Sequence, residues 1–334
     1  MSGTQENGDR KGRFGRYRAA VAERPGSPGP TDRTGVLAGV TAYSLWGLFP
    51  LVFHRLRAVA PVETLLHRIL WSFVVVLILL AWQGPRGWVR PLLADRRQLV
   101  RLATAGGLIA GNWLLYIWAV NHGHVVEAAL GYYINPLLTV ALGVLVLGER
   151  LRRLQLAALG LGAVSVAVLT VSYGRPPWIA LVLAVTFAGY SFQKKAVTVG
   201  SAPSLAVEMA VLAPFAVAGL LLLEANGSAA FGHRSIALDF GLAGLGIVTA
   251  IPLLLFASAA RRIPLSVLGL LQYLTPTGQL LCGVLLLGEG LPPARLAGFS
   301  LVWIALMVLA ADAVAARRRG ATEIAPVPPV EIPA

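Results

Sequence analysis

Residues 132–151 read YYINPLLTVALGVLVLGERL, and residues 272–291 read QYLTPTGQLLCGVLLLGEGL. The two segments align without gaps, which places Tyr133 on Tyr273, Pro136 on Pro276 and Glu149 on Glu289. Each segment is an apolar run of about twenty residues, long enough to cross a bilayer core. The repeat therefore predicts a chain built from two related halves.

Apolar runs of this length recur along the whole chain. Hydrophobic residues make up 57% of its 334 residues and charged residues only 13%, whereas a soluble domain is about 25% charged. We therefore predict an all-α, polytopic membrane protein with ten transmembrane helices. The predicted spans cover residues 34–53, 62–81, 102–120, 125–147, 153–172, 177–193, 203–223, 240–258, 264–287 and 294–314.

Lys and Arg residues gather in alternate loops, which predicts the orientation. Loops such as those with Arg96, Arg152, Lys194 and Arg261 are basic and are predicted to be cytoplasmic, together with both termini. The net charge of +13 is therefore not a nucleic-acid footprint, because the basic residues lie between apolar runs. The predicted location is the cytoplasmic membrane.

An odd number of spans per half requires the two halves to enter the membrane in opposite senses. The loops agree, because Arg150 follows the first copy of the repeat where Gly290 follows the second. This pattern predicts an inverted-topology repeat. The predicted domains are a disordered cytoplasmic tail (1–33), a first five-helix repeat (34–172), a second (177–314) and a second disordered tail (315–334).

Five stretches carry a resemblance to a known family: ETLLHRILWS (63–72), NWLLYIWAVNHGHVVEAALGYYINPLL (112–138), LGERLRR (147–153), KK (194–195) and RRIPLSVLGLLQYLTPT (261–277). They resemble EamA-type transporters of the drug/metabolite transporter superfamily, specifically the RarD family. The resemblance implies ten helices in two inverted five-helix repeats around a central cavity. It also implies transport of a small metabolite or drug-like solute, and it does not name the solute.

Polar residues within the predicted second span are candidates for the transport pathway. Glu63, His67 and Trp71 recur every four residues and share one helix face, with Arg68 beside them. Counting the helical rise places Arg68 roughly 9 Å below the outer surface. A charge at that depth needs a functional reason. The alternative is that Arg68 is a snorkelling side chain or a fixed ion-pair strut.

The third and fourth predicted spans add an aromatic and amide cluster. Ligand contact and hydrogen bonding between helices are equally open for its Asn and Tyr residues. The predicted substrate pathway comprises Glu63, His67, Arg68, Trp71, Asn112, Trp113, Tyr116, Glu127, Tyr132, Asn135, Gln272 and Tyr273.

Equivalent prolines interrupt both copies of the repeat. Pro136 and Pro276 cannot donate to the carbonyls of Tyr132 and Gln272. A missing backbone bond is tolerated in a bilayer where protein or a hydrated cavity satisfies the carbonyl, so the prolines indicate helix breaks near a central site. A kink without function is the alternative.

Proton coupling is a further hypothesis. Glu63 and His67 lie one turn apart near the predicted outer mouth, where burial and nearby charge can bring their titration near neutral pH. No deeply buried carboxylate is evident in the sequence, which favours facilitated exchange as the competing mechanism.

The function classes differ in the residues that they require. A membrane metalloenzyme needs a motif such as HExxH or paired carboxylates, and neither occurs mid-span; His122 and His124 have no third ligand in view. The prediction is a secondary transporter that works by alternating access, with no cofactor and no metal. An intramembrane enzyme or a membrane scaffold is the alternative. The predicted partners are a small-molecule substrate and the bilayer but no nucleic acid, and whether the chain forms a homodimer is left open.

Overall fold

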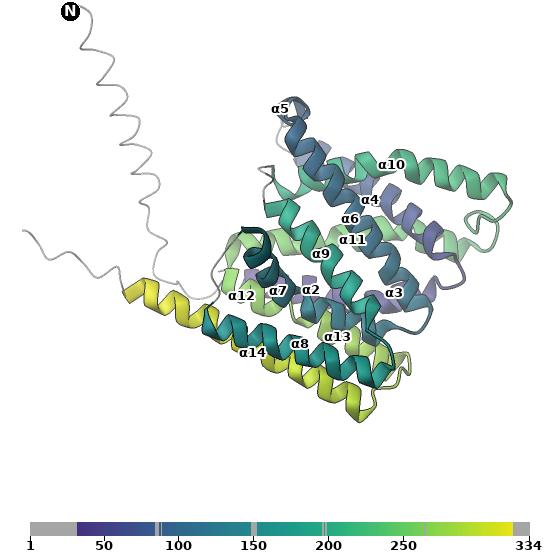
Figure 1. Cartoon of the computed structure of the whole chain (residues 1–334). Helices are drawn as coiled ribbons and strands as arrows, with labels where there is room; N and C mark the ends of the chain where they lie inside the picture. Colours follow the sequence, from purple (N-terminus) through teal and green to yellow (C-terminus); the bar gives the residue numbers. More distant parts are fainter. Residues whose placement is uncertain are drawn as a thin grey trace, which may run out of the picture.

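A computed structural model describes residues 32–83, 87, 89–147, 152–195, 197, 199–263 and 265–322. Within these ranges the fold is entirely helical (Figure 1). The first half contains α2 (Arg33–Gly47), α3 (Phe49–Arg55), α4 (Pro61–Gln83), α5 (Val89–Ala94), α6 (Arg96–Asn121), α7 (Val125–Leu147) and α8 (Arg153–Tyr173). The second half contains α9 (Trp178–Lys195), α10 (Ser201–Ala225), α11 (Ile236–Arg262), α12 (Leu265–Leu271), α13 (Leu274–Leu281), the π-helix η1 (Cys282–Leu286) and α14 (Pro293–Thr322).

Helices occupy all ten predicted spans. By length and composition, seven helical segments of the described chain qualify as membrane spans, and Val125–Ala141 is a shorter apolar helix. The prediction of an all-helical, polytopic membrane protein is therefore confirmed.

Several boundaries differ from the prediction. The last helix continues to Thr322, so the predicted disordered tail does not begin at residue 315. The other predicted tail, 1–33, lies outside the described residues except for its last two, and Glu149 of the first repeat copy also lies outside them. The short helix α5, between α4 and α6, was not predicted.

Side-chain caps start helices at both ends of the bundle. Asp95 accepts hydrogen bonds from the backbone N–H groups of Arg97 and Gln98, each at 3.1 Å, at the start of α6. Its second carboxylate oxygen accepts from the Gln98 side chain at 2.9 Å, and these bonds lower the pKa of Asp95 below its usual value. Ser235 caps α11 in the same way through the N–H of Leu238. Such caps satisfy donors that a helix cannot pair internally.

The helices pack through small residues that allow close approach, as is common in membrane bundles. Figure 1 shows α8 and α14 lying side by side, and the two helices contact each other along their length. Gly298 of α14 packs against the Leu169 side chain of α8, and Ser165 donates a 2.7 Å hydrogen bond to the Gly298 carbonyl. In the α4–α11 contact, Gly246 packs directly against the backbone of Trp71.

Gly246→Ala is expected to destabilise the protein by about 1–3 kcal/mol, the usual cost of overpacking a tight contact. A Cβ at Gly246 would lie 2.4 Å from the carbonyl oxygen of Trp71 and 2.6 Å from its carbonyl carbon. These are backbone atoms, so the two helices would have to separate. The matched control is Gly244→Ala, because a Cβ there meets nothing within 4 Å. Thermal unfolding in detergent measures the difference, and equal midpoints for the two variants would contradict this account of the contact.

Candidate functional site

The carboxylate of Glu63 holds a loop of the second half at the predicted outer end of the bundle. Glu63 is 1% exposed, and its Oε1 accepts hydrogen bonds from the N–H groups of Ala230 at 2.7 Å and Phe231 at 3.0 Å. The Phe231 ring lies against the ring of buried His67, with centroids 4.6 Å apart. Arg234 of the same loop donates to the carbonyl oxygen of Ala58. The loop between α10 and α11 is thus held against the start of α4 by hydrogen bonds and a ring contact.

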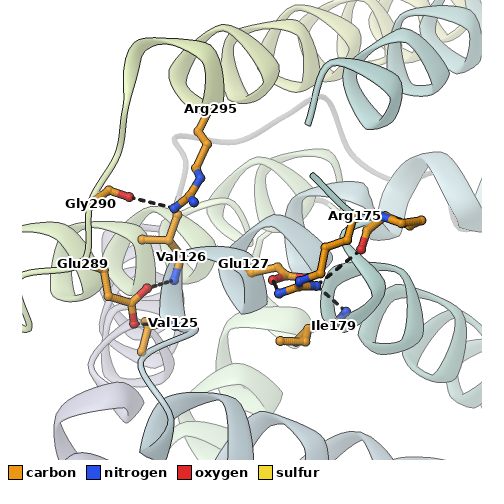
Figure 2. Close-up of polar contacts among 9 residues, drawn as sticks. Val125, Val126, Glu127, Arg175, Ile179, Glu289, Gly290 and Arg295 are labelled. Carbon is orange, nitrogen blue, oxygen red and sulfur yellow. Dashed lines mark hydrogen bonds and ion pairs between the residues drawn. The ribbon is translucent and has the colours of Figure 1, made fainter. Parts of the chain in front are cut away.

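Glu289 makes a related contact between the halves. Figure 2 shows its carboxylate directed at the first turn of α7, where Oε1 accepts from the N–H of Val125 at 2.6 Å and Oε2 from the N–H of Val126 at 2.8 Å. A carboxylate at a helix N-terminus pairs free N–H donors and is favoured by the helix dipole. A residue near the end of the second repeat copy therefore caps the helix that carries the first copy.

Glu127, one residue after Val126, completes the contacts at this end (Figure 2). It is 1% exposed and receives two hydrogen bonds from Arg175, at 2.8 and 3.3 Å, and one from the N–H of Ile179 at 3.1 Å. Its charge is therefore neutralised by a bidentate partner, the strongest geometry for a carboxylate. All three carboxylates close the predicted outer end by binding backbone N–H groups.

Arg68 lies deeper, within an aromatic cage. The side chain is 96% buried, since 4% of the residue is exposed. Its guanidinium carbon lies 3.8 Å from the centroid of the Trp113 ring and 5.5 Å from those of Phe49 and Phe53. Its Nε donates a 3.3 Å hydrogen bond to Thr249 Oγ1 of α11. No carboxylate in the described part of the chain pairs with Arg68.

The cage compensates this charge incompletely. Burying an ion costs several kcal/mol even after relaxation. A desolvated cation–π contact returns about 2 kcal/mol, and one hydroxyl acceptor uses one of five guanidinium donors. The ion-pair strut that the sequence left open has no partner among the described residues. The position of Arg68 in the interior also argues against snorkelling.

A chain of polar aromatic side chains leads away from the cage. The Tyr116 ring contacts Phe53, with centroids 6.0 Å apart, and Tyr132, with centroids 5.7 Å apart. Tyr132 donates to Asn112 Oδ1 at 3.1 Å, and Asn112 Nδ2 donates to the Leu183 carbonyl and Thr186 Oγ1, both at 2.9 Å. Asn112 thus bridges α6, α7 and α9. The Tyr116 hydroxyl, by contrast, is buried without a hydrogen-bond partner among the described residues.

The remaining predicted pathway residues are not gathered around Arg68 by any contact that the structure describes. Trp71 is half-buried at the α4–α11 contact, and Asn135 is buried with an unpaired Oδ1 on α7. Gln272 is exposed and Tyr273 half-buried at the break between α12 and α13. The two prolines also differ, because α7 runs continuously through Pro136 whereas the second copy breaks just before Pro276.

Glu208 is a deeply buried carboxylate, so the prediction that the chain has no such group is wrong. Glu208 is 0% exposed on α10 and pairs with Lys194 of α9, with Oε1 2.5 Å from Nζ. Ser204 donates to the same oxygen at 2.9 Å and also receives a bond from Lys194. The signal was present, because Glu208 interrupts the apolar run LAVEMAVLA at residues 205–213.

One groove of the described structure lies apart from the predicted pathway residues. A groove of about 330 Å³ runs between α4, α5, α6 and α10, lined by apolar residues such as Phe73, Leu92 and Ala206. No predicted pathway residue lines it. Among the described residues no three His, Cys, Asp or Glu side chains gather as a metal site, and His122 stacks on Trp118 instead. In this conformation Arg68, Asn112 and Tyr116 are buried.

Comparison with known proteins decides the family. The EamA-like transporter family matches residues 33–171. Protein RarD of Streptomyces exfoliatus is 51% identical over 86% of this chain and 91% of its own length. The chain belongs to the RarD family of EamA-like transporters. An uncharacterized transporter of Pseudomonas aeruginosa is 44% identical over 86% of this chain and 96% of that protein.

These relatives confirm the predicted class, a membrane transporter and not an enzyme. A solved crystal structure with 22% sequence identity aligns at a TM-score of 0.53, over 82% of this chain and 96% of that one. At that identity the likeness concerns the fold alone. As a membrane transporter of the EamA and RarD family, the chain acts on a small-molecule substrate.

Proposed function

We propose that this chain is a secondary transporter of the cytoplasmic membrane whose two inverted five-helix repeats, 34–172 and 177–314, give alternating access to a site between them. The starts of equivalent helices support the repeat. Four pairs begin at a constant spacing of 140 residues: Pro61 and Ser201, Arg96 and Ile236, Val125 and Leu265, Arg153 and Pro293. The spacing equals that of the two sequence copies.

Helix packing supports the same proposal. Exchanging each helix for its equivalent in the other half leaves the main contacts unchanged. The equivalent helices are α2 and α9, α4 and α10, α6 and α11, and α7 and α13. Accordingly, α2 packs on α11 and α13, and α9 packs on α6 and α7. Helix α4 contacts α11, and α10 contacts α6. The self-equivalent pairs α4–α10, α7–α13 and α8–α14 also pack together. Such exchange symmetry suits two bundles that rock against each other.

The proposed orientation places both termini in the cytoplasm, because the basic loops gather on that side. A reporter that is active only in the cytoplasm, fused after Ala334, is expected to be fully active. The same reporter placed in the 226–235 loop is expected to be silent. A silent C-terminal fusion in a full-length, inserted protein would contradict an even number of spans.

The proposed cargo is a small metabolite or drug-like organic solute. The observation that carries this proposal is the set of buried polar groups between the halves: Arg68 in its aromatic cage, the unpaired Tyr116 hydroxyl and Thr249 of the opposite half. A membrane scaffold has no need of such a set in its interior. The twelve predicted pathway residues remain candidates, and Arg68 is the first among them.

Counterflow tests transport even while the cargo is unidentified. Proteoliposomes are loaded with an unlabelled metabolite extract and placed in a dilute extract labelled uniformly with ¹³C. Mass spectrometry of the vesicle contents is expected to show at least one labelled solute above the level in protein-free vesicles. A spectrum identical to that of the protein-free vesicles would refute the transporter proposal in favour of a scaffold.

Proton linkage is proposed as the energy source. Glu63 and His67 lie at the closed outer end, and Glu208 supplies the buried carboxylate that a proton carrier requires. In the same vesicles, an imposed pH gradient should drive accumulation of the solute found by counterflow, and Glu63→Gln or Glu208→Gln should abolish the effect. Flux that follows the solute gradient alone in every variant would identify a uniporter or exchanger.

A further inference from the structure

Arg68 differs from every other strongly buried charged side chain that the structure describes. Glu127 has Arg175, Glu208 has Lys194 and Asp312 has Arg152 within ion-pair distance. Glu63 accepts two backbone N–H groups instead. Arg68 has one hydroxyl acceptor and no carboxylate partner within the described ranges.

The contrast is sharpest with the equivalent position of the other half. Arg68 lies as many positions after Pro61, the first residue of α4, as Glu208 lies after Ser201, the first residue of α10. The chain supplies a counterion to Glu208 at 2.5 Å. At Arg68 it supplies aromatic faces, with Trp113 at 3.8 Å. The missing negative charge is therefore specific to the Arg68 site.

Two side chains at this site have hydrogen-bond donors without a partner among the described residues. The terminal nitrogens of Arg68 donate no hydrogen bond to a described residue, and the Tyr116 hydroxyl is also unpaired. The Phe53 ring contacts both side chains. A planar guanidinium binds a carboxylate through two parallel hydrogen bonds. The faces of Trp113 and Phe53 offer an apolar surface to the rest of a ligand.

We propose that the site binds a monovalent organic anion, with its carboxylate on Arg68 and its apolar or aromatic body against Trp113 and Phe53. A single cation with no second one in contact fits one negative charge better than two. This inference rests on the proposed transport function, because it names the class of solute that the transporter would carry. It requires the site to open, since Arg68 is 4% exposed in the closed conformation.

The test compares acids with their neutral amides on the purified full-length protein. The probes are benzoate and phenylacetate against benzamide and phenylacetamide, which have the same bodies without the charge. Thermal unfolding is followed with a dye that fluoresces on reacting with a thiol, because the one cysteine of the sequence, Cys282, is buried. Ligand binding raises the unfolding midpoint by mass action.

At least one acid is expected to raise the midpoint of the wild-type protein more than its amide does. Arg68→Gln should remove this response, and Arg68→Lys should retain part of it. The matched control Arg55→Gln, which removes an exposed arginine, should respond like the wild type. Without ligand, Arg68→Gln should unfold at the wild-type temperature or higher, because the charge that it removes has no carboxylate partner among the described residues.

Four results would overturn the proposal: no response to either acid, equal responses to acid and amide, a response retained in Arg68→Gln, or a ligand-free Arg68→Gln protein that unfolds earlier or fails to fold. The last would make Arg68 a structural strut. Failure of the proposed transport function can be distinguished from failure of the proposed anion site. A protein that discriminates acid from amide but shows no counterflow keeps the anion site without the transport function. Counterflow of neutral or cationic solutes alone keeps the transport function without the anion site.

Discussion

Lys194→Met is expected to destabilise the protein by about 3–5 kcal/mol, the cost of leaving one member of a buried ion pair without its partner. Glu208 is 0% exposed, and Lys194 Nζ is the cation beside it, 2.5 Å from Oε1. After the substitution the Glu208 carboxylate would keep only neutral donors, the Ser204 hydroxyl at 2.9 Å and the nearby Tyr190 hydroxyl. Neutral donors do not replace the charge of Lys194 beside a carboxylate that is removed from water.

The reverse substitution supplies the control. In Glu208→Gln the remaining charge is on Lys194, whose side chain is 25% exposed and can turn toward water. Its cost should be less than half that of Lys194→Met. The double variant Lys194→Met/Glu208→Leu should recover most of the loss, because an apolar pair of similar volume replaces the ion pair. Unfolding midpoints of the wild type, Lys194→Met, Glu208→Leu and the double variant form a double-mutant cycle, and additive losses would show that the two side chains do not interact.

Arg68→Ala is expected to reduce binding of the transported solute by about 10- to 100-fold while the protein still inserts into the membrane. The estimate corresponds to loss of charge-assisted hydrogen bonds worth about 1.5–3 kcal/mol. The measurement is counterflow of the solute that the vesicle experiment identifies, as a function of its external concentration. Arg55→Gln again controls for the loss of a positive charge. Wild-type flux at every concentration would remove Arg68 from the pathway.

The helices followed from the sequence because each apolar run has the length of a bilayer core and ends at polar residues. The constant spacing of the helix starts shows the same repeat that the segments 132–151 and 272–291 carry. The sequence also led directly to Arg68, since an arginine within an apolar run is costly without a function. These features are local, and a single sequence records them.

Contacts between distant segments did not follow from the sequence. Glu63 and Glu289 bind backbone N–H groups. Because nearly every residue type has a backbone N–H group, the sequence does not indicate which residues are the partners. Equivalence between the repeats was also misleading at Gln272. Gln272 aligns with Tyr132, whose hydroxyl donates to Asn112. In the second copy, however, the helix is interrupted between α12 and α13, and Gln272 is exposed there. Two copies of one motif can therefore differ where one helix is continuous and the other is not.

Cross-linking the two halves at the predicted outer end tests alternating access most directly. Ala58 and Arg234 lie in loops of different halves, and the Arg234 side chain donates to the Ala58 carbonyl. Both residues are exposed and lie outside the predicted pathway. In a Cys282→Ala background, which has no other cysteine, Ala58→Cys/Arg234→Cys can be joined by a short thiol cross-linker that a reductant cleaves.

Counterflow through the cross-linked double variant is the deciding measurement. Because the two loops must separate for the outer end to open, cross-linking is expected to stop counterflow, and reduction is expected to restore it. Each single-cysteine variant, treated in the same way, should retain its flux. Counterflow that continues at the uncross-linked rate while the two loops are joined would contradict alternating access between the two halves.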